Sequence, residues 1–485
     1  MHQADDSQAN SGDAIEEIFR RFDEALYSKR YADALRIADQ IGVKRSNREG
    51  RAIVAALKAA ALLGLKREAE AKRQIDEVRE LSPAEPFSAE TLFTAGLLVE
   101  RFDVAGDALD VLIARFPDVA REQERDYVWL LLRNEPENQE RRNEDRRIAL
   151  ARIGFGGDTP SADFAAADAI SILMKRADTA AAAELLRFVD EPTAIENMLI
   201  TRRYAALWPQ IEQHAGPRLE KVRASSVAAA QRAYEAAPED HENLANYINA
   251  LRHARRLDEA IVLRSKLPAT SAAMASADEQ MGWAVNNLAF ALHDAGKTEE
   301  ADSLFAMLND APMPPEGWRI SMKINRLELL VLEGKYDRAL PLIEPTARTN
   351  GSPYADQLVR RLRYCVLSAL GRKSEAATHL PEMLKHSADA PHSTVDALLC
   401  AGDVDRAEKV ALETLRLTGS KKDSFEESLV RQLQPVELTS DDPSVWQGRW
   451  NELKSRPAIR REFDRLGRDM PSEFLVPKGL AVSAK

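Results

Sequence analysis

The chain has 485 residues, of which 45% are hydrophobic and 30% charged, and this is too apolar a composition for a disordered protein. Its formal net charge of −11 would repel a phosphate backbone, so we expect no nucleic-acid partner. Two cysteines, Cys365 and Cys400, are too few for a disulfide framework, and both lie in apolar helical stretches. We expect two small buried hydrophobes rather than a redox pair.

The sequence shows no segment that would insert into a membrane. The longest apolar run, residues 52–65, is shorter than a bilayer span and contains Lys58. The opening residues 1–12 are polar and have no hydrophobic region, so we expect a disordered tail and, as the sequence is written, no signal peptide. These features predict a cytoplasmic protein. A periplasmic protein whose export leader has been removed is the alternative.

A short pattern recurs along the chain: an apolar helix end, a turn residue that is often glycine, and an alanine five positions later that opens a second amphipathic helix. It occurs at Lys29–Ala34, Gly64–Ala69, Glu100–Ala105, Arg255–Ala260, Gly296–Ala301, Gly334–Ala339, Gly371–Ala376 and Gly402–Ala407. Within each half of the chain, neighbouring occurrences lie 31 to 41 residues apart. This period fits a pair of helices with two short turns. Such a pair must stack on its neighbours to bury both its faces.

The stretch VNNLAFALHDAGKTEEADSLF resembles a tetratricopeptide repeat. The matching positions are Leu288, Ala289 and Leu292 in the first helix, Gly296 in the turn, and Ala301 and Phe305 in the second helix. LANYINALRHARRLDEAI and INRLELLVLEGKYDRALPLI are similar in the same way. The resemblance covers roughly residues 14–118 and 236–418. It implies an all-α fold, a right-handed α-solenoid of tetratricopeptide-like helical hairpins with a degenerate middle section and a C-terminal helical cap.

In chain order, the sequence predicts five sections. They are a disordered polar tail (1–12), N-terminal tetratricopeptide-like hairpins (13–118), degenerate helical repeats (119–235), a C-terminal repeat array (236–418), and a linker with capping helices and a loose tail (419–485). The linker is GSKKDSFEES, and a loop is expected at VELTSDDPS. The apolar face of the cap consists of Trp446, Trp450, Leu453, Phe463 and Leu466. This cap would cover the last exposed core of the solenoid.

Asparagine stands at one position in three consecutive first helices. Asn246, Asn287 and Asn325 each lie nine residues before the turn positions Arg255, Gly296 and Gly334. The resemblance implies that first helices line a concave surface and that asparagine at this place hydrogen-bonds the backbone of a bound peptide. A carboxamide both donates and accepts, so it can satisfy an extended peptide without reading its side chains. Further contacts are expected from Asn249, Arg252, His253, Asn286, Phe290 and His293 on the same face.

The alternative is that these asparagines brace adjacent helices or face solvent. The sequence also departs from the carboxylate-clamp members of the family, which carry paired lysine or arginine on neighbouring helices. Here only Arg252 is close to the asparagines. Binding of a C-terminal carboxylate is therefore not implied.

The other motifs in the sequence do not indicate a phosphate-binding, metal-binding or catalytic site. The glycine-rich segment Gly154–Asp158 follows a helix rather than a strand and no Lys-Ser/Thr follows it, so we interpret it as a helix end and turn rather than a phosphate loop. His379 and His386 are roughly 10 Å apart along one helix, too far to share an ion, and His392 lies after a proline. No nucleophile motif is present. We expect no metal, no cofactor and no enzyme activity.

The leading functional hypothesis is a scaffold or adaptor that binds an extended peptide or a helix of a partner protein in its concave groove. A second is a helical-repeat subunit that docks through its C-terminal cap in a larger envelope or regulatory complex. An RNA-binding repeat protein would need a basic groove. An all-helical glycoside-processing enzyme would need an aromatic cleft with two facing carboxylates, and only 6% of the residues are aromatic. The oligomeric state is left open.

Overall fold

The computed structural model describes residues 17–42, 47–134, 139–157, 160–310, 317–348, 351–416, 420–434 and 445–475. Over these residues the chain is helical, and its one β-type pairing is an isolated bridge between Thr201 and Gly467. The all-α prediction is confirmed. The predicted tail 1–12 and the loop 436–444 lie outside the described residues.

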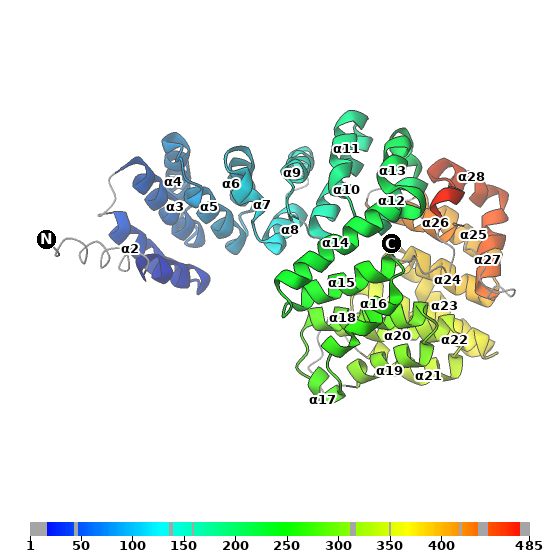
Figure 1. Ribbon diagram of the computed structural model, residues 1–485. Coiled ribbons are helices and arrows are strands. Elements are labelled where there is room, and N and C mark those ends of the chain that lie inside the picture. The colour runs from blue at the N-terminus through cyan, green and yellow to red at the C-terminus, as the bar shows by residue number, and fades with distance from the viewer. Residues whose placement is uncertain are drawn as a thin grey trace. The chain divides into compact units, whose positions relative to one another are not determined.

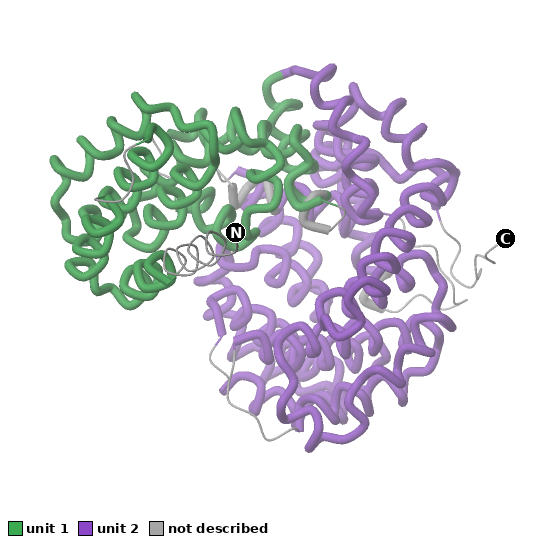
Figure 2. The backbone as a smooth tube through the Cα atoms, turned by 60° about the vertical axis from the view of Figure 1, so that its left-hand side comes forward, with its two compact units in different colours: residues 1–176 green, residues 177–485 purple. Residues whose placement is uncertain are grey.

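Contacts divide the chain into two compact units, residues 1–176 (unit 1) and 177–485 (unit 2), coloured separately in Figure 2. The division falls inside the section predicted as degenerate repeats, at the turn after α10. Each unit contains helical hairpins in which a first and a second helix are joined by a tight turn (Figure 1).

In unit 1, residues 17–27 are helical and precede a row of hairpins. The helices are α2 Tyr31–Gly42, α3 Arg48–Gly64, α4 Glu68–Leu81, α5 Phe87–Leu98, α6 Phe102–Arg115, α7 Pro117–Arg121, α8 Arg125–Asn134, α9 Glu140–Arg152 and α10 Pro160–Lys175. The first helices α3 and α5 pack on each other, and each carries its own second helix, α4 or α6.

Unit 2 continues the same construction and ends in the cap. Its elements are α11 Thr179–Leu185, η2 Leu186–Phe188, α12 Pro192–Ile200, η3 Arg202–Leu207, α13 Trp208–Ala215, η4 Pro217–Leu219, α14 Glu220–Ala236, α15 His241–His253, α16 Leu257–Val262, η5 Leu263–Lys266, α17 Ser271–Met274, α18 Glu279–Asp294, α19 Thr298–Asn309, α20 Trp318–Leu332, α21 Tyr336–Ala347, α22 Pro353–Ala369, α23 Lys373–Lys385, η6 Ser387–Asp389, α24 Pro391–Ala401, α25 Val404–Thr414, α26 Ser420–Gln432, α27 Val445–Ser455, α28 Pro457–Leu466 and η7 Ser472–Phe474.

The hairpin turns share one geometry, a residue with positive φ followed five positions later by a buried alanine. Within the described residues the pairs are Lys29 and Ala34, Lys66 and Ala71, Glu100 and Ala105, Ala177 and Ala182, Arg255 and Ala260, Gly296 and Ala301, Gly334 and Ala339, Gly371 and Ala376, and Gly402 and Ala407. The left-handed residue lets the next N–H reach back along the helix, as Lys297 N–H does to the Leu292 carbonyl at 2.8 Å. The buried methyl group allows the second helix to start close against the first.

One predicted turn, Gly64–Ala69, is in the wrong register. The left-handed residue is Lys66, with φ of 58°, and the buried alanine is Ala71, whereas Ala69 is exposed. Gly64 is the last residue of α3, and a Cβ atom there would lie 2.3 Å from the ring of Tyr31. This glycine therefore marks close packing against α2 rather than a turn.

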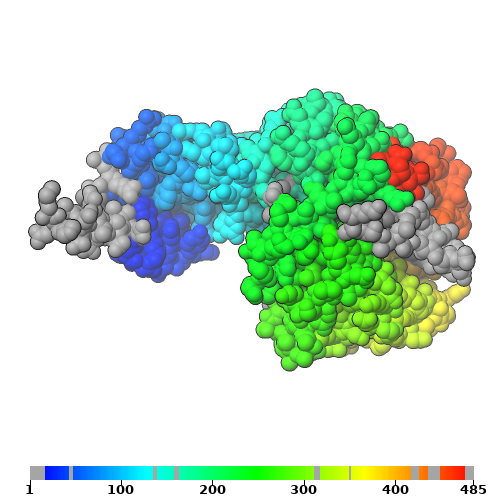
Figure 3. Space-filling model, viewed as in Figure 1, coloured from blue at the N-terminus to red at the C-terminus, as the bar shows by residue number. Residues whose placement is uncertain are grey.

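The C-terminal elements of unit 2 pack on its N-terminal elements, because α26 contacts α12, α28 contacts η3 and η7 contacts η4 (Figures 1 and 3). The predicted linker at 419–428 is wrong, because residues from Ser420 form α26, which contacts α12. Phe425, Leu429 and Val430 are buried and lie on one helical stripe, a pattern that a linker would lack. The predicted cap is confirmed by the buried side chains of Trp450, Leu453, Phe463 and Leu466, while that of Trp446 lies outside the described residues.

Arg468 joins the two ends of unit 2. Its Nε donates to the Leu199 carbonyl at 2.7 Å and its Nη2 to Glu212 Oε1 at 2.8 Å. Its guanidinium carbon lies 3.6 Å from the ring centre of Trp208, and its backbone N–H donates to the Ile200 carbonyl at 2.8 Å. These contacts hold the residues after α28 against α12 and α13.

The expectation of two separate cysteine thiols is wrong. Cys365 on α22 and Cys400 on α24 form a disulfide, with Cα atoms 5.1 Å apart. Their separation of 35 residues is one repeat, so they occupy facing positions on adjacent first helices. This Cα separation is within the range that a disulfide spans.

Candidate functional site

Five first helices of unit 2 pack against one another in chain order: α15, α18, α20, α22 and α24. We call the accessible side chains of these helices the first-helix face. Every residue predicted to bind peptide lies on α15, α18 or α20. The structure therefore brings the predicted set onto three neighbouring helices of one unit.

Five asparagine side chains were expected to face a ligand, and three of them instead form a chain of hydrogen bonds that links neighbouring helices. Asn287 Nδ2 donates to the Ala245 carbonyl of α15 at 3.0 Å. Asn286, which is buried, donates to Asn287 Oδ1 at 3.2 Å and accepts from Asn325 Nδ2 of α20 at 2.8 Å. This chain of amides links α15, α18 and α20, which is the bracing role considered as the alternative.

Asn246 and Asn249 remain on α15 with their amides available. Both are half-buried, and among the described residues neither side-chain amide has a hydrogen-bond partner. His253 follows at the end of the same helix, and spacings of three and four residues place all three on one stripe. Burial lowers the pKa of His253, and the charge of Arg252 lowers it further, so the imidazole is neutral near pH 7 and can donate and accept.

A charged cluster closes this stripe at the turn end of α15 and α18. Arg252 Nε donates to Asp294 Oδ2 at 2.8 Å, and the guanidinium carbon lies 4.8 Å from the ring centre of Phe290. Burial of Asp294 opposes its ionisation, but hydrogen bonds from His293 and Arg252 hold its pKa at about 2. Arg252 is therefore engaged by a permanent carboxylate and an aromatic face, and its side chain is fixed rather than free to meet a ligand carboxylate.

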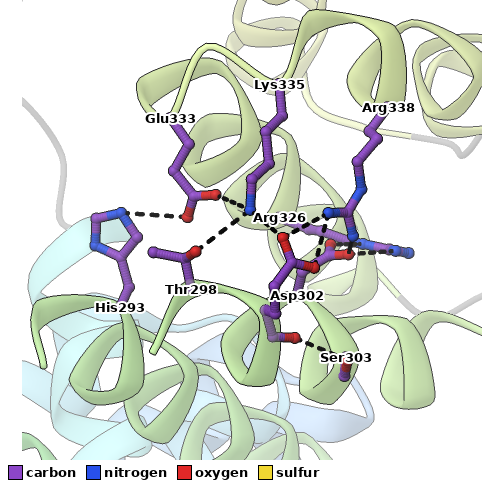
Figure 4. Close-up of polar contacts among 9 residues, drawn as sticks. His293, Thr298, Asp302, Ser303, Arg326, Glu333, Lys335 and Arg338 are labelled. Carbon is purple, nitrogen blue, oxygen red and sulfur yellow. Dashed lines mark hydrogen bonds and ion pairs between the residues drawn. The ribbon is translucent and has the colours of Figure 1, made fainter. Parts of the chain in front are cut away.

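An ion-pair network anchors the second helices behind this face (Figure 4). Buried Asp302 of α19 accepts from Arg326 of α20 at 2.8 Å and also pairs with Arg338 of α21. Lys335 bridges Glu299 and Glu333, each at 2.6 Å. Glu333 in turn lies 3.5 Å from His293 Nε2, so the predicted ligand contact His293 is part of this network.

A second set of residues, at the contacts between the first helices α20, α22 and α24, escaped the sequence analysis. Arg361 of α22 pairs with Glu328 of α20 and donates to Asp396 of α24 at 3.0 Å. Tyr354 and His392 approach across the same α22–α24 seam, with ring centres 5.8 Å apart. The available signal was spacing, because Arg361 and Asp396 are one repeat apart, as are the two cysteines.

The motifs considered for other chemistry are structural. After α9 the glycine-rich segment forms a turn in which Gly154, Gly156 and Gly157 all have positive φ, as interpreted. Within the described ranges, no group of His, Cys, Asp and Glu is arranged to hold a metal ion. Over the same residues no helix has both the length and the apolar character to cross a bilayer.

The sequence matches no family model and no curated protein. Among solved structures, the chain is similar to one in a structure of Naa15/Naa10 bound to HypK-THB, with 14% identity and a TM-score of 0.23 over 92% of this chain and 74% of that chain. It is also similar to yeast Tom70, with 13% identity and a TM-score of 0.23 over 93% of this chain and 99% of that chain. At this TM-score, no binding site of either structure can be assigned to residues of this chain.

Proposed function

We propose that the protein is a non-enzymatic scaffold of the tetratricopeptide type, and that the first-helix face of unit 2 binds an extended peptide or a helix of a partner protein. The observation that supports this most directly is the stripe Asn246, Asn249 and His253. Three half-buried polar groups with unused donors and acceptors stand in a row on one helix. A peptide backbone supplies the complementary groups at a similar spacing.

The neighbouring contacts support the proposal by giving this stripe a rigid setting. The amide chain from Asn325 to Ala245 fixes α15, α18 and α20 relative to one another. A preorganised surface loses less entropy on binding than a mobile one. In this proposal Asn286, Asn287 and Asn325 hold the surface, and Asn246 and Asn249 contact the ligand.

Docking through the C-terminal cap is less well supported. The apolar side chains that would make such an interface, Trp450, Leu453 and Phe463, are already buried within unit 2. Because the apolar face of the cap is packed inside unit 2, the cap has little exposed apolar surface with which to bind a partner.

Site-specific photo-crosslinking tests the proposal. A benzophenone amino acid at Asn249 should capture partner proteins in cells, and the same group at Val262, which is 72% exposed on the second helix α16, should not. The double variant Asn246→Ala/Asn249→Ala should reduce recovery of the same partners at least tenfold while leaving the thermal unfolding unchanged. Equal crosslinking from both positions, or undiminished recovery by the double variant, would contradict a ligand-binding face here.

A further inference from the structure

The apolar core of unit 2 divides into separate clusters at α22. One cluster of buried side chains lies between α20, α21 and α22 and includes Leu327 and Val359. A second cluster extends from α23 through α28 and includes Leu398 of α24. Among the described residues, the buried members that α22 contributes to this second cluster are Tyr364 and Leu367. Apolar packing across the seam between α22 and α24 therefore draws on few side chains of α22.

Polar groups are buried at this seam, and several of them are not satisfied. Arg361 donates to Asp396 at 3.0 Å. Buried oxygen atoms of both helices have no hydrogen-bond partner among the described residues, namely Gln357 Oε1 on α22 and Ser393 Oγ, Thr394 Oγ1 and Asp396 Oδ1 on α24. A buried polar atom without a partner is more stable where water can reach it. The polar groups therefore favour a seam that is open to water.

The helix α24 connects the C-terminal elements to the preceding repeats. It contacts α26 and α27, and Arg449 of α27 donates to the Leu399 carbonyl at 2.5 Å and to the Cys400 carbonyl. The contact of α26 with α12 then closes unit 2. The disulfide between Cys365 and Cys400 thus lies where helices α15 to α22 meet the elements that close the unit (Figure 1).

We propose that this disulfide is a redox switch for the α22–α24 seam, which a dithiol reductant opens and oxidation closes. Cys400 is half-buried at the end of α24, whereas Cys365 is buried, so a thiolate of the dithiol attacks the Cys400 sulfur. Cys365 leaves as a thiolate and takes up a proton. The second thiol of the reductant attacks the mixed disulfide, which releases Cys400 as a thiol and the reductant as its own disulfide. Two electrons and two protons pass to the protein in total. The switch acts on the closure of unit 2 and is independent of peptide binding at the first-helix face.

Hydrogen exchange of the full-length oxidised protein, measured by mass spectrometry before and after treatment with dithiothreitol, tests the switch. The chain has two cysteines, so the reagent has a single disulfide to reduce. Reduction should speed exchange in α22 and α24 by about tenfold or more and leave α15 and α18 within about twofold. Cys365→Ser/Cys400→Ser should exchange like the reduced protein with or without the reagent. A native protein that dithiothreitol does not reduce, an unchanged rate in α24 after reduction, or equal acceleration throughout unit 2 would each overturn the proposal.

A second double variant tests the role of the buried polar groups. Arg361→Met/Asp396→Leu replaces the ion pair by apolar side chains, a replacement that often leaves stability unchanged or raises it. Reduction of this variant should speed exchange in α24 by no more than about threefold, because opening the seam no longer hydrates buried charges. Arg372 and Glu375 form an exposed ion pair outside the seam, so Arg372→Met/Glu375→Leu is the matched control and should respond as the wild type does. A full wild-type response in Arg361→Met/Asp396→Leu would also overturn the proposal, and circular dichroism checks that both variants fold.

Discussion

Arg361 donates a hydrogen bond to Asp396 at 3.0 Å across the seam between α22 and α24, and each of these residues is followed four positions later by one cysteine of the Cys365–Cys400 disulfide. The ion pair and the disulfide therefore lie one helical turn apart in the same register. Asp396 is buried, and a buried carboxylate is tolerated where it is paired. A covalent bond beside it holds the two helices at the separation that the pair needs.

The first prediction concerns this disulfide. It closes a loop of 35 residues, so its loss should reduce the free energy of unfolding of unit 2 by about 2–4 kcal/mol. Calorimetry with and without reductant measures the effect, and intact mass under non-reducing conditions shows whether two hydrogens are missing. The double variant Cys365→Ser/Cys400→Ser serves as the control, because reductant should leave its unfolding unchanged. Two free thiols in the protein purified from its native host would contradict the prediction.

The second prediction concerns the hairpin turns. Lys66 adopts φ of 58°, a conformation that costs an ordinary L-residue about 1 kcal/mol more than glycine. Lys66→Gly should therefore stabilise unit 1 by about 1 kcal/mol, whereas Lys66→Ala should change little. Gly371 has φ of 75°, and no atom lies within 4 Å of the position of an added Cβ, so Gly371→Ala should destabilise unit 2 by about the same amount. Denaturant unfolding measures all three, and a destabilising Lys66→Gly would show that the lysine side chain matters more than its backbone.

The hairpins were predictable because each turn favours a particular residue type at two positions of the sequence. A left-handed residue favours glycine, and a buried close contact favours alanine, so Gly296 with Ala301 and Gly334 with Ala339 were placed correctly. The pattern misled at Gly64, where a second physical cause, the ring of Tyr31, also requires glycine. The turn at Ala177 was not among the predicted occurrences, although Lys29, Glu100 and Arg255 show that such a turn can be recognised without glycine.

Partners across helices were not predictable in the same way. The repeat spacing predicts that Asn246, Asn287 and Asn325 occupy equivalent positions on their helices. Whether each side-chain amide faces a groove or a neighbouring helix depends on how the helix is rotated about its axis, and the spacing does not determine that rotation. Asn325 thus contacts Asn286 rather than lying free. The disulfide was missed for a different reason, because two cysteines in apolar helices look like buried thiols until the helices are known to be adjacent.

The third prediction concerns the closure of unit 2 by Arg468. Its side chain satisfies the Leu199 carbonyl, pairs with Glu212 and lies over Trp208. Arg468→Ala should reduce the free energy of unfolding by about 2 kcal/mol and speed hydrogen exchange in α28, because the hydrogen bonds and the cation–π contact are lost together. Arg461 is exposed on α28 and has no ion pair among the described residues, so Arg461→Ala is the control and should leave both measurements unchanged. Equal exchange in the two variants would mean that the cap is held by its apolar contacts alone.

The fourth prediction is a pH dependence with a defined sign. Burial lowers the pKa of His392, Arg361 lowers it further, and Asp396 opposes both. Because the folded pKa lies below the ordinary value of 6.5, the unfolded chain takes up a proton first as the pH falls. The stability of unit 2 should be full above about pH 6.5 and decline as the pH falls from there toward the folded pKa, with His253 adding a decline of the same sign. Denaturant unfolding between about pH 7.5 and 5.5 measures this decline, and His392→Gln should make it shallower, since the variant has no imidazole to protonate. A variant with the wild-type slope would show that His392 titrates alike in the folded and unfolded chain, and the contact with Tyr354 would then not exclude water from the imidazole.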